Sequence, residues 1–213
     1  MIQRKNARLL ALAAMLIFLS TLAVLLARQF NMGPTLPVPA YRSFGPVEAP
    51  VQIYEYTDFA CPACRHAAEK IDEMLKVFGA GLRVNFKHYP LLTIHPWSFH
   101  AAAYADCAGE QGKFKEYAGL LFAGQEKWGQ AKDKPKEFEA YAKQLKLDWP
   151  KMVTCGDAPE THKRLKLEIA EGDVKGVTAT PTFFINGRRA VGSAQLIDQA
   201  MKFDNMLRSA AKP

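Results

Sequence analysis

The spacing of hydrophobic residues predicts alternating strands and helices from about residue 47 onward. Val51 to Thr57 is rich in β-branched and aromatic residues and predicts a largely buried strand. From Pro62 to Phe78, apolar positions recur every three or four residues, which predicts an amphipathic helix that ends at Gly79. Leu82 to Tyr89 alternates and predicts a second strand. This order indicates a βαβ unit.

The spacing then becomes helical over a long block before strands return. We expect helices at residues 98–110, 114–122, 136–145 and 160–171, with a short turn between Pro150 and Cys155. Two short strands follow at 182–185 and 188–191, joined by the hairpin dipeptide Asn186-Gly187, and a last helix is expected at 194–208. The order of elements predicts an α/β fold in which helices cover both faces of a mixed sheet.

The longest apolar run lies near the N-terminus. The first eight residues carry three basic side chains and no acid, and Leu9 to Ala27 is uncharged and almost wholly apolar, closed by Arg28. A helix of that length spans about 28 Å, close to the ~30 Å core of a bilayer. We predict a transmembrane anchor at 9–28. A cleaved signal peptide is the alternative, but the run exceeds a signal's apolar region and no small-x-small cleavage site follows promptly.

The basic residues before the apolar run also predict its orientation. They favour a cytoplasmic segment at residues 1–8, so the protein would cross the inner (cytoplasmic) membrane once and place the rest of the chain in the periplasm or an equivalent extracytoplasmic space. Five prolines between Gly33 and Pro50 predict a stiff spacer at 29–46. The folded domain is then expected at 47–211.

Composition changes this picture in one respect. The chain has 213 residues and a net charge of +7, but four of its 28 basic residues lie in residues 1–28, where there is no acid. The remainder therefore carries 24 basic against 21 acidic residues, too small an excess for a nucleic-acid footprint. We expect no nucleic-acid partner. Aromatic residues at 11% also exclude a disordered chain.

The candidate chemistry lies in Cys61-Pro62-Ala63-Cys64, where the first predicted strand gives way to the first helix. The unpaired amides and positive dipole of a helix N-terminus stabilise a thiolate, so Cys61 should have a lowered pKa and attack disulfides. Cys64, one turn further on, should be shielded and close a disulfide with Cys61. Half of a zinc site is the alternative, but Cys107 and Cys155 do not supply a second closely spaced pair.

Two segments, residues 55–64 (EYTDFACPAC) and 176–187 (GVTATPTFFING), carry a family resemblance. They resemble the thioredoxin superfamily, and specifically its DsbA-like disulfide oxidoreductases. The resemblance extends over about 47–211 and implies a thioredoxin fold with an inserted helical domain at about 92–172. It also implies thiol–disulfide exchange with exported proteins, led by disulfide bond formation. Ala63 stands where the oxidising members carry His, which leaves reductase or isomerase activity open.

The resemblance also implies roles for individual residues. Cys61 would be the nucleophile and Cys64 the resolving thiol, while Thr180 and Pro181 would form a cis-proline loop that faces them and offers backbone to substrate; the alternative is a trans Pro181 that starts a strand. Pro62 and Ala63 are the other expected substrate contacts. Glu55 falls where these proteins place an acid beneath the cysteines, to carry the proton of Cys64. An exposed strand position for Glu55 is the alternative, and Lys87 is a candidate partner for it.

The other chemistry-bearing residues receive structural interpretations. In an oxidising compartment Cys107 and Cys155 predict a structural disulfide, with a second redox pair or two unpaired cysteines as alternatives. Three histidines, at positions 88, 95 and 100, are interpreted as surface or capping residues, and no metal site is expected. The redox-active disulfide of Cys61 and Cys64 should need no other cofactor.

Partners follow from the same hypothesis. We expect exported cysteine-containing proteins as substrates and a membrane quinone-linked re-oxidase of the DsbB or VKOR type, with membrane contact through residues 9–27. A non-catalytic, chaperone-like binding module, in which the CxxC is structural or metal-bound, is the alternative from another class of protein.

Overall fold

The computed structural model describes the backbone of residues 2–29 and 35–210, and the side chains of residues 12–25 and 35–203. The chain divides into two compact units, Met1–Pro34 and Thr35–Pro213. The first unit contains one helix and the second contains a five-stranded sheet with all the remaining described helices.

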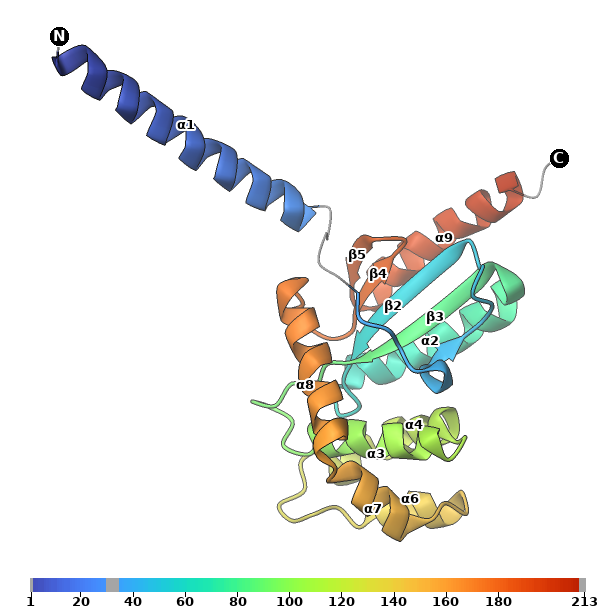
Figure 1. Ribbon diagram of the computed structural model, residues 1–213. Coiled ribbons are helices and arrows are strands. Elements are labelled where there is room, and N and C mark those ends of the chain that lie inside the picture. The colour runs from blue at the N-terminus through green and yellow to red at the C-terminus, as the bar shows by residue number, and fades with distance from the viewer. Residues whose placement is uncertain (1, 30–34, 211–213) are drawn as a thin grey trace. The chain divides into compact units, whose positions relative to one another are not determined.

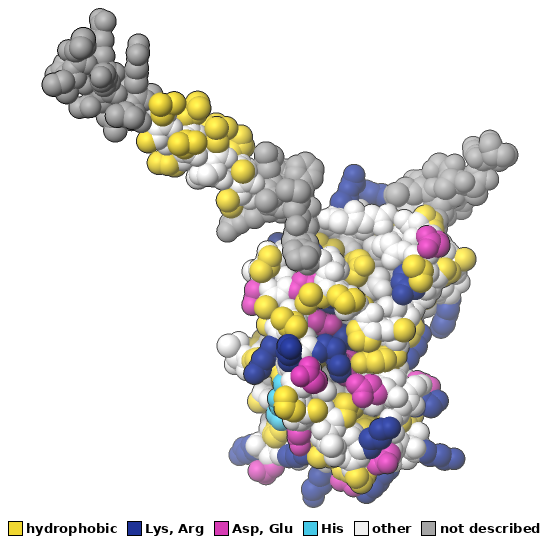
Figure 2. Space-filling view, in the orientation of Figure 1, with side chains coloured by type: hydrophobic (Ala, Val, Ile, Leu, Met, Phe, Trp, Pro, Cys, Tyr) yellow, Lys and Arg dark blue, Asp and Glu magenta, His cyan; other side chains and the backbone are white. Residues whose placement is uncertain are grey.

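Helix α1 (Ile2–Gln29) forms the first unit. Its described side chains are all exposed, and all are apolar except those of Ser20 and Thr21. The hydroxyls of these two residues donate to the carbonyls of Ile17 and Phe18. Figure 2 shows this hydrophobic covering in yellow. Among the residues that the structure describes, no helix is long and apolar enough to cross a membrane. The predicted anchor at 9–28 extends beyond the described side chains and stays a prediction.

The sheet of the second unit has the strand order β1-β3-β2-β4-β5. Its centre is the predicted βαβ unit, in which β2 (Val51–Thr57) and β3 (Leu82–His88) run parallel and α2 (Pro62–Phe78) connects them. The outer strands pair antiparallel to their neighbours, and they are β1 (Ser43–Phe44), β4 (Thr182–Ile185) and β5 (Arg188–Val191). The sheet is therefore mixed, as the order of elements predicts.

Helices cover both faces of this sheet. Figure 1 shows α2 and the last helix, α9 (Gly192–Ala210), together on one face, where they enclose the main hydrophobic core. A second cluster on the opposite face packs against α8 (Pro159–Val174) and contains Tyr56 and Phe184. The helices between β3 and α8 form the inserted block, and they are α3 (Ser98–Glu110), α4 (Phe114–Ala123), α5 (Gln125–Trp128), α6 (Glu137–Gln144) and α7 (Trp149–Gly156). The α/β thioredoxin-type fold with a helical insertion is confirmed.

The inserted block is closed by a disulfide. Cys107 in α3 and Cys155 in α7 are bonded, with their Cα atoms 5.9 Å apart. The bond joins two helices that also pack directly against each other. On the chain-entropy model, a loop of this size gives about 4 kcal/mol of stability.

The predicted spacer at 29–46 is wrong for its described part. Residues 35–46 belong to the folded unit, because β1 pairs with β3 and the backbone N–H of Leu36 donates to Glu171 at 3.2 Å. A 3₁₀ turn at Ala40–Arg42 precedes β1 and places the Arg42 side chain inside the protein, fully buried. The proline count suggested an extended linker, whereas the charged side chain of Arg42 fixes the segment to the domain.

Arg42 lies at the centre of a buried ionic group that links the sheet to the inserted helices. Its guanidinium contacts Glu168 of α8 at 2.6 Å and Asp106 of α3 at 3.1 Å, and donates to the carbonyl of Phe86 in β3 at 3.2 Å. Burial alone would raise the pKa of Asp106, but the nearby His88 and Arg42 lower it to about 2. The ionic group therefore compensates the cost of burying its charges.

We expect Arg42→Ala to lower the free energy of unfolding by about 3–5 kcal/mol, because it leaves the buried Glu168 without its cation and removes a fully buried cation from Asp106. Urea denaturation of the full chain measures this. Arg164→Ala is the matched control, since Arg164 also contacts Asp106, at 2.9 Å, but is 30% exposed. The Arg164→Ala variant should lose less than about 1 kcal/mol of unfolding free energy. If both variants lost the same free energy of unfolding, Arg42 would not be the residue on which the buried ionic group depends.

Candidate active site

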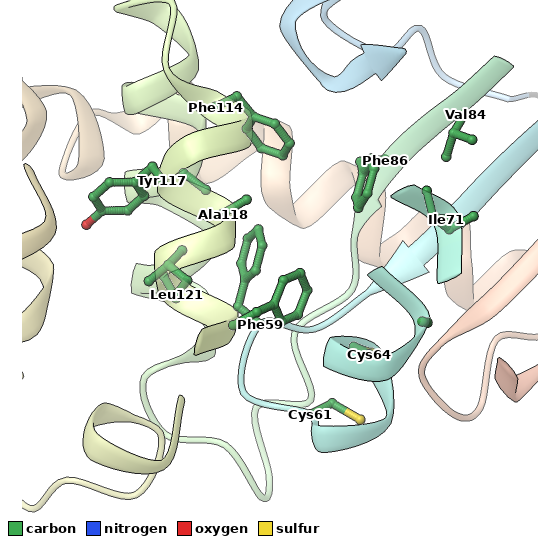
Figure 3. Close-up of a cluster of buried hydrophobic side chains, with 14 of the residues drawn as sticks. Phe59, Cys61, Cys64, Ile71, Val84, Phe86, Phe114, Tyr117, Ala118 and Leu121 are labelled. Atoms are coloured by element: carbon green, nitrogen blue, oxygen red, sulfur yellow. The ribbon is translucent and has the colours of Figure 1, made fainter. Parts of the chain in front are cut away.

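The two cysteines of the CxxC sequence lie at the start of α2. Cys61 is the N-cap residue with an extended backbone, and Pro62 occupies the first helical turn, where its missing N–H costs no hydrogen bond. The carbonyl of Cys61 accepts from the N–H groups of Cys64 at 3.0 Å and Arg65 at 3.3 Å. Figure 3 shows both cysteines on this first turn. The local sequence therefore produces the helix start that thiolate stabilisation requires.

The environment of Cys61 favours its thiolate. A hydrogen bond from the Cys64 thiol is the main cause that lowers the pKa of Cys61 to about 5, and backbone N–H groups of the first turn add to it against the effect of burial. Cys61 is 9% exposed, and its Sγ lies 3.4 Å from the carbonyl oxygen of Thr180. An acidic thiol that keeps some exposure to solvent is suited to nucleophilic attack.

The environment of Cys64 has the opposite effect. Cys64 is fully buried, and burial raises the pKa of its thiol well above the usual value, with the neighbouring Cys61 adding to the shift. The backbone N–H of Asp58 donates to Cys64 Sγ at 3.5 Å. The structure thus separates one acidic, accessible thiol from one buried thiol that holds its proton.

Glu55 is fully buried rather than exposed on the strand. It lies on β2 opposite Phe86 and shares a sheet face with Ile53, the face covered by α2. Burial raises the pKa of Glu55 to about 8 against the opposing effect of the nearby Thr57 hydroxyl, and neither carboxyl oxygen has a partner with the distance and angle of a hydrogen bond. A carboxyl group with this pKa holds a proton at neutral pH and releases it readily.

The suggested partner of Glu55, Lys87, lies elsewhere. Glu55 is in register with Phe86, so Lys87 points to the other face of the sheet. There its Nζ contacts Glu171 of α8 at 2.7 Å and donates to the carbonyl of Leu36 at 2.7 Å. Because Lys87 lies one residue after the position opposite Glu55, it forms an ion pair with Glu171 on the other face of the sheet and does not reach the cysteines.

The second motif lies opposite the cysteines. The Thr180–Pro181 peptide bond is cis, and the carbonyl of Thr180 is the acceptor that contacts Cys61. The Pro181 carbonyl accepts from the N–H of Gly192 at 2.9 Å, which ties the loop to the end of β5. Pro62 and Ala63 are exposed beside Cys61. Four of the residues expected from the sequence, Pro62, Ala63, Thr180 and Pro181, therefore lie around the sulfur of Cys61.

Two further residues support the site and were not predicted. Gln125 of α5 is buried and donates from Nε2 to the carbonyls of Phe59 at 2.9 Å and Cys61 at 3.3 Å. Asp58 accepts hydrogen bonds from the segment that joins β3 to α3. Their partners are far away in the sequence, so no local spacing could have indicated them.

The histidines differ in part from the surface interpretation. His88 is buried, its ring packs against Phe59, and its Nε2 lies 3.0 Å from Asp106, because β3 carries it into the ionic group of Arg42. His95 is partly buried and its Nδ1 lies 2.7 Å from Asp58. His100 is exposed.

Comparison with known proteins agrees with this architecture. The family model described as Thioredoxin matches residues 38–206. Wolbachia pipientis alpha-DsbA1 superimposes with a TM-score of 0.71 and 19% identity, covering 82% of this chain and 94% of that one. Pseudomonas aeruginosa DsbA2 gives a TM-score of 0.63 with 24% identity, covering 78% of this chain and 94% of that one. These likenesses show the fold.

A curated relative is much longer than this chain. The Na(+)/H(+) antiporter NhaA 1 of Salinispora arenicola is 38% identical over 149 residues, which is 70% of this chain but 22% of the antiporter. The chain therefore corresponds to about a fifth of that protein.

We expect Cys64→Ala to raise the pKa of Cys61 by about one unit or more, because it removes the thiol that donates to the thiolate. The absorbance of the thiolate at 240 nm as a function of pH measures this. Cys64→Ser is the matched control, since its hydroxyl can still donate, and it should hold the pKa closer to the original value of about 5. The same pKa in all three proteins would show that Cys64 does not stabilise the thiolate.

Glu55→Gln should abolish one component of the pH dependence of stability. The folded protein keeps the Glu55 proton up to about pH 8, whereas the unfolded chain loses it near its ordinary pKa of about 4.3. Stability therefore falls as pH rises between these values, and the loss is complete above pH 8. In urea denaturation of the reduced protein, Glu55→Gln should match the wild type at low pH and exceed it at high pH. The exposed Glu48→Gln control should follow the wild type throughout.

Proposed function

The chain belongs to the thioredoxin family, and from that premise we propose that it catalyses thiol–disulfide exchange with exported proteins, acting chiefly to form their disulfide bonds. Cys61 is the nucleophile and Cys64 the resolving thiol. The observation that carries the proposal is the contrast between the two sulfurs at one helix start. The pKa of Cys61 is lowered to about 5, while that of the buried Cys64 is raised.

In the oxidising direction, a substrate thiolate attacks Sγ of Cys61 in the Cys61–Cys64 disulfide. A substrate–Cys61 bond forms, the Cys61–Cys64 bond breaks, and Cys64 leaves with the electron pair. A second substrate thiolate then attacks the substrate sulfur and releases Cys61 as a thiolate. Two electrons pass from substrate to enzyme. The lowered pKa of Cys61 favours this release, because a more acidic thiol is a better leaving group.

Glu55 and the cis-proline loop complete the proposed mechanism. The leaving Cys64 thiolate is buried and needs a proton, and the protonated carboxyl of Glu55, on the face beneath α2, can supply it. The substrate lies along Thr180 and Pro181 and beside the exposed Pro62 and Ala63, which brings its sulfur to Cys61.

The proposed location is extracytoplasmic, with α1 as a single-pass anchor and residues 1–8 in the cytoplasm. Three observations support it. The described side chains of α1 are mainly exposed and apolar, its Ser20 and Thr21 hydroxyls are bonded to its own backbone, and the Cys107–Cys155 disulfide is of the kind that persists outside the cytoplasm. Tethering would raise the effective concentration of the enzyme beside a membrane quinone-linked re-oxidase.

Cys64→Ala should trap exported proteins as mixed disulfides on Cys61, because the resolving thiol is gone. Non-reducing electrophoresis of the full chain, expressed in cells and alkylated at once, detects these adducts, and Cys61→Ala is the control that should form none. Absence of adducts, together with stoichiometric zinc in the purified protein, would replace this function by that of a metal-bound binding module.

Equilibration of the Cys61–Cys64 pair with glutathione tests the direction. An oxidase is expected to have a potential nearer to about −120 mV than to about −270 mV, the values of DsbA and thioredoxin. A potential at the thioredoxin end would make the protein a reductase, and efficient rescue of scrambled disulfides would make it an isomerase.

A further inference from the structure

Asp58 is a buried carboxylate three residues before Cys61, on the turn between β2 and α2. It accepts four hydrogen bonds. Oδ1 accepts from the N–H of Ala60 at 2.8 Å and from the hydroxyl of Ser98, and Oδ2 accepts from the N–H of Leu91 at 2.8 Å and from Nδ1 of His95 at 2.7 Å. A carboxylate has about four acceptor sites, so this one is fully used.

The backbone of the same residue contacts both cysteines. The N–H of Asp58 donates to Sγ of Cys64 at 3.5 Å, and its carbonyl accepts from the N–H of Cys61 at 3.1 Å. Fixing the side chain of Asp58 therefore fixes the backbone group that faces the buried sulfur. The anchors on Oδ2 and the Ser98 hydroxyl belong to the segment between β3 and α3 and to the start of α3.

We propose that Asp58 is a positioning residue that holds its own N–H against the sulfur of Cys64 and so stabilises the Cys64 thiolate when that thiolate forms. This inference rests on the proposed function and deepens it.

In the resolving step, the Cys64 thiolate attacks Sγ of Cys61 in the mixed disulfide. The Cys61–Cys64 bond forms, the Cys61–substrate bond breaks, and the substrate leaves as a thiolate that takes a proton from water. In the reverse direction Cys64 is the leaving group, so one N–H assists both directions.

The attack by Cys61 does not depend on this contact in the same way. The Cys61 thiolate is stabilised chiefly by the Cys64 thiol and by the N–H groups of the first turn of α2. Loss of the Asp58 side chain should therefore slow resolution more than attack. General damage to the fold would slow both.

Asp58→Asn tests this inference with little change in shape. The amide oxygen can still accept from Ala60 and Ser98, but the amide NH₂ now faces the N–H of Leu91, donor against donor. The probe is the aromatic disulfide 5,5′-dithiobis(2-nitrobenzoate), added to the reduced full chain in a stopped-flow instrument. Attack by Cys61 releases one coloured thiolate, and resolution by Cys64 releases a second.

We expect Asp58→Asn to slow the second release by about tenfold, the effect of losing one well-placed hydrogen bond, while the first release changes by less than about threefold. Asp148→Asn is the matched control. Asp148 also accepts a backbone hydrogen bond, from Lys151 at 3.0 Å at the start of α7, and this variant should change neither release. Ser98→Ala removes one of the four donors and should slow the second release by an intermediate factor. This variant replaces Asp58→Asn as the test if Asp58→Asn folds poorly.

Unchanged release of both thiolates by folded Asp58→Asn would overturn the inference, as would equal slowing of the two. Failure of the proposed function looks different. In that case Cys64→Ala would trap no exported protein, although the wild-type chain would still release both coloured thiolates.

Discussion

The buried guanidinium of Arg42 holds together three parts of the chain that are far apart in sequence: β3, helix α3 and helix α8. Removing these charges from water is costly, and the cost is offset only because each charge has a partner at close range. Arg42 contacts α3 at Asp106, and the first residue of the same helix is Ser98, which donates to Asp58 beside the cysteines. Helix α3 thus connects the buried ionic group to the redox site.

The insertion supports the site through hydrogen bonds rather than through added charge. Gln125 donates to the carbonyls of Phe59 and Cys61, and Phe59 packs between this block and the sheet, with its ring centroid 4.9 Å from that of Phe122. Ala63 contributes no charge to the dipeptide. The causes that lower the pKa of Cys61 are hydrogen bonds from Cys64, Thr180 and the first-turn N–H groups, and no charged side chain is among them.

Local spacing was sufficient to predict the central βαβ unit, the helical block and the position of the CxxC pair, because strand and helix periods and the helix-start residues are encoded within a few positions. The buried position of Glu55 was implied by the family resemblance. Long-range partners were not accessible in this way. Prolines suggested that residues 29–46 were a spacer, but the buried charge of Arg42 finds its partners more than 60 residues later, in α3 and α8. For the same reason, Lys87 was assigned the wrong partner, and the role of Asp58 was not predicted.

Glu55 and Asp58 lie on the same short stretch of chain and are both buried, yet their surroundings suit opposite tasks. Neither oxygen of Glu55 has a hydrogen-bond partner, so its charged form is poorly stabilised and the group can keep and deliver a proton. All acceptor sites of Asp58 are used by donors from two segments, which suits a fixed anchor. The difference arises because the fold supplies four donors to Asp58, whereas burial dominates at Glu55. The chemistry of this site therefore depends on the placement of neutral hydrogen-bond donors as much as on the identity of its ionisable residues.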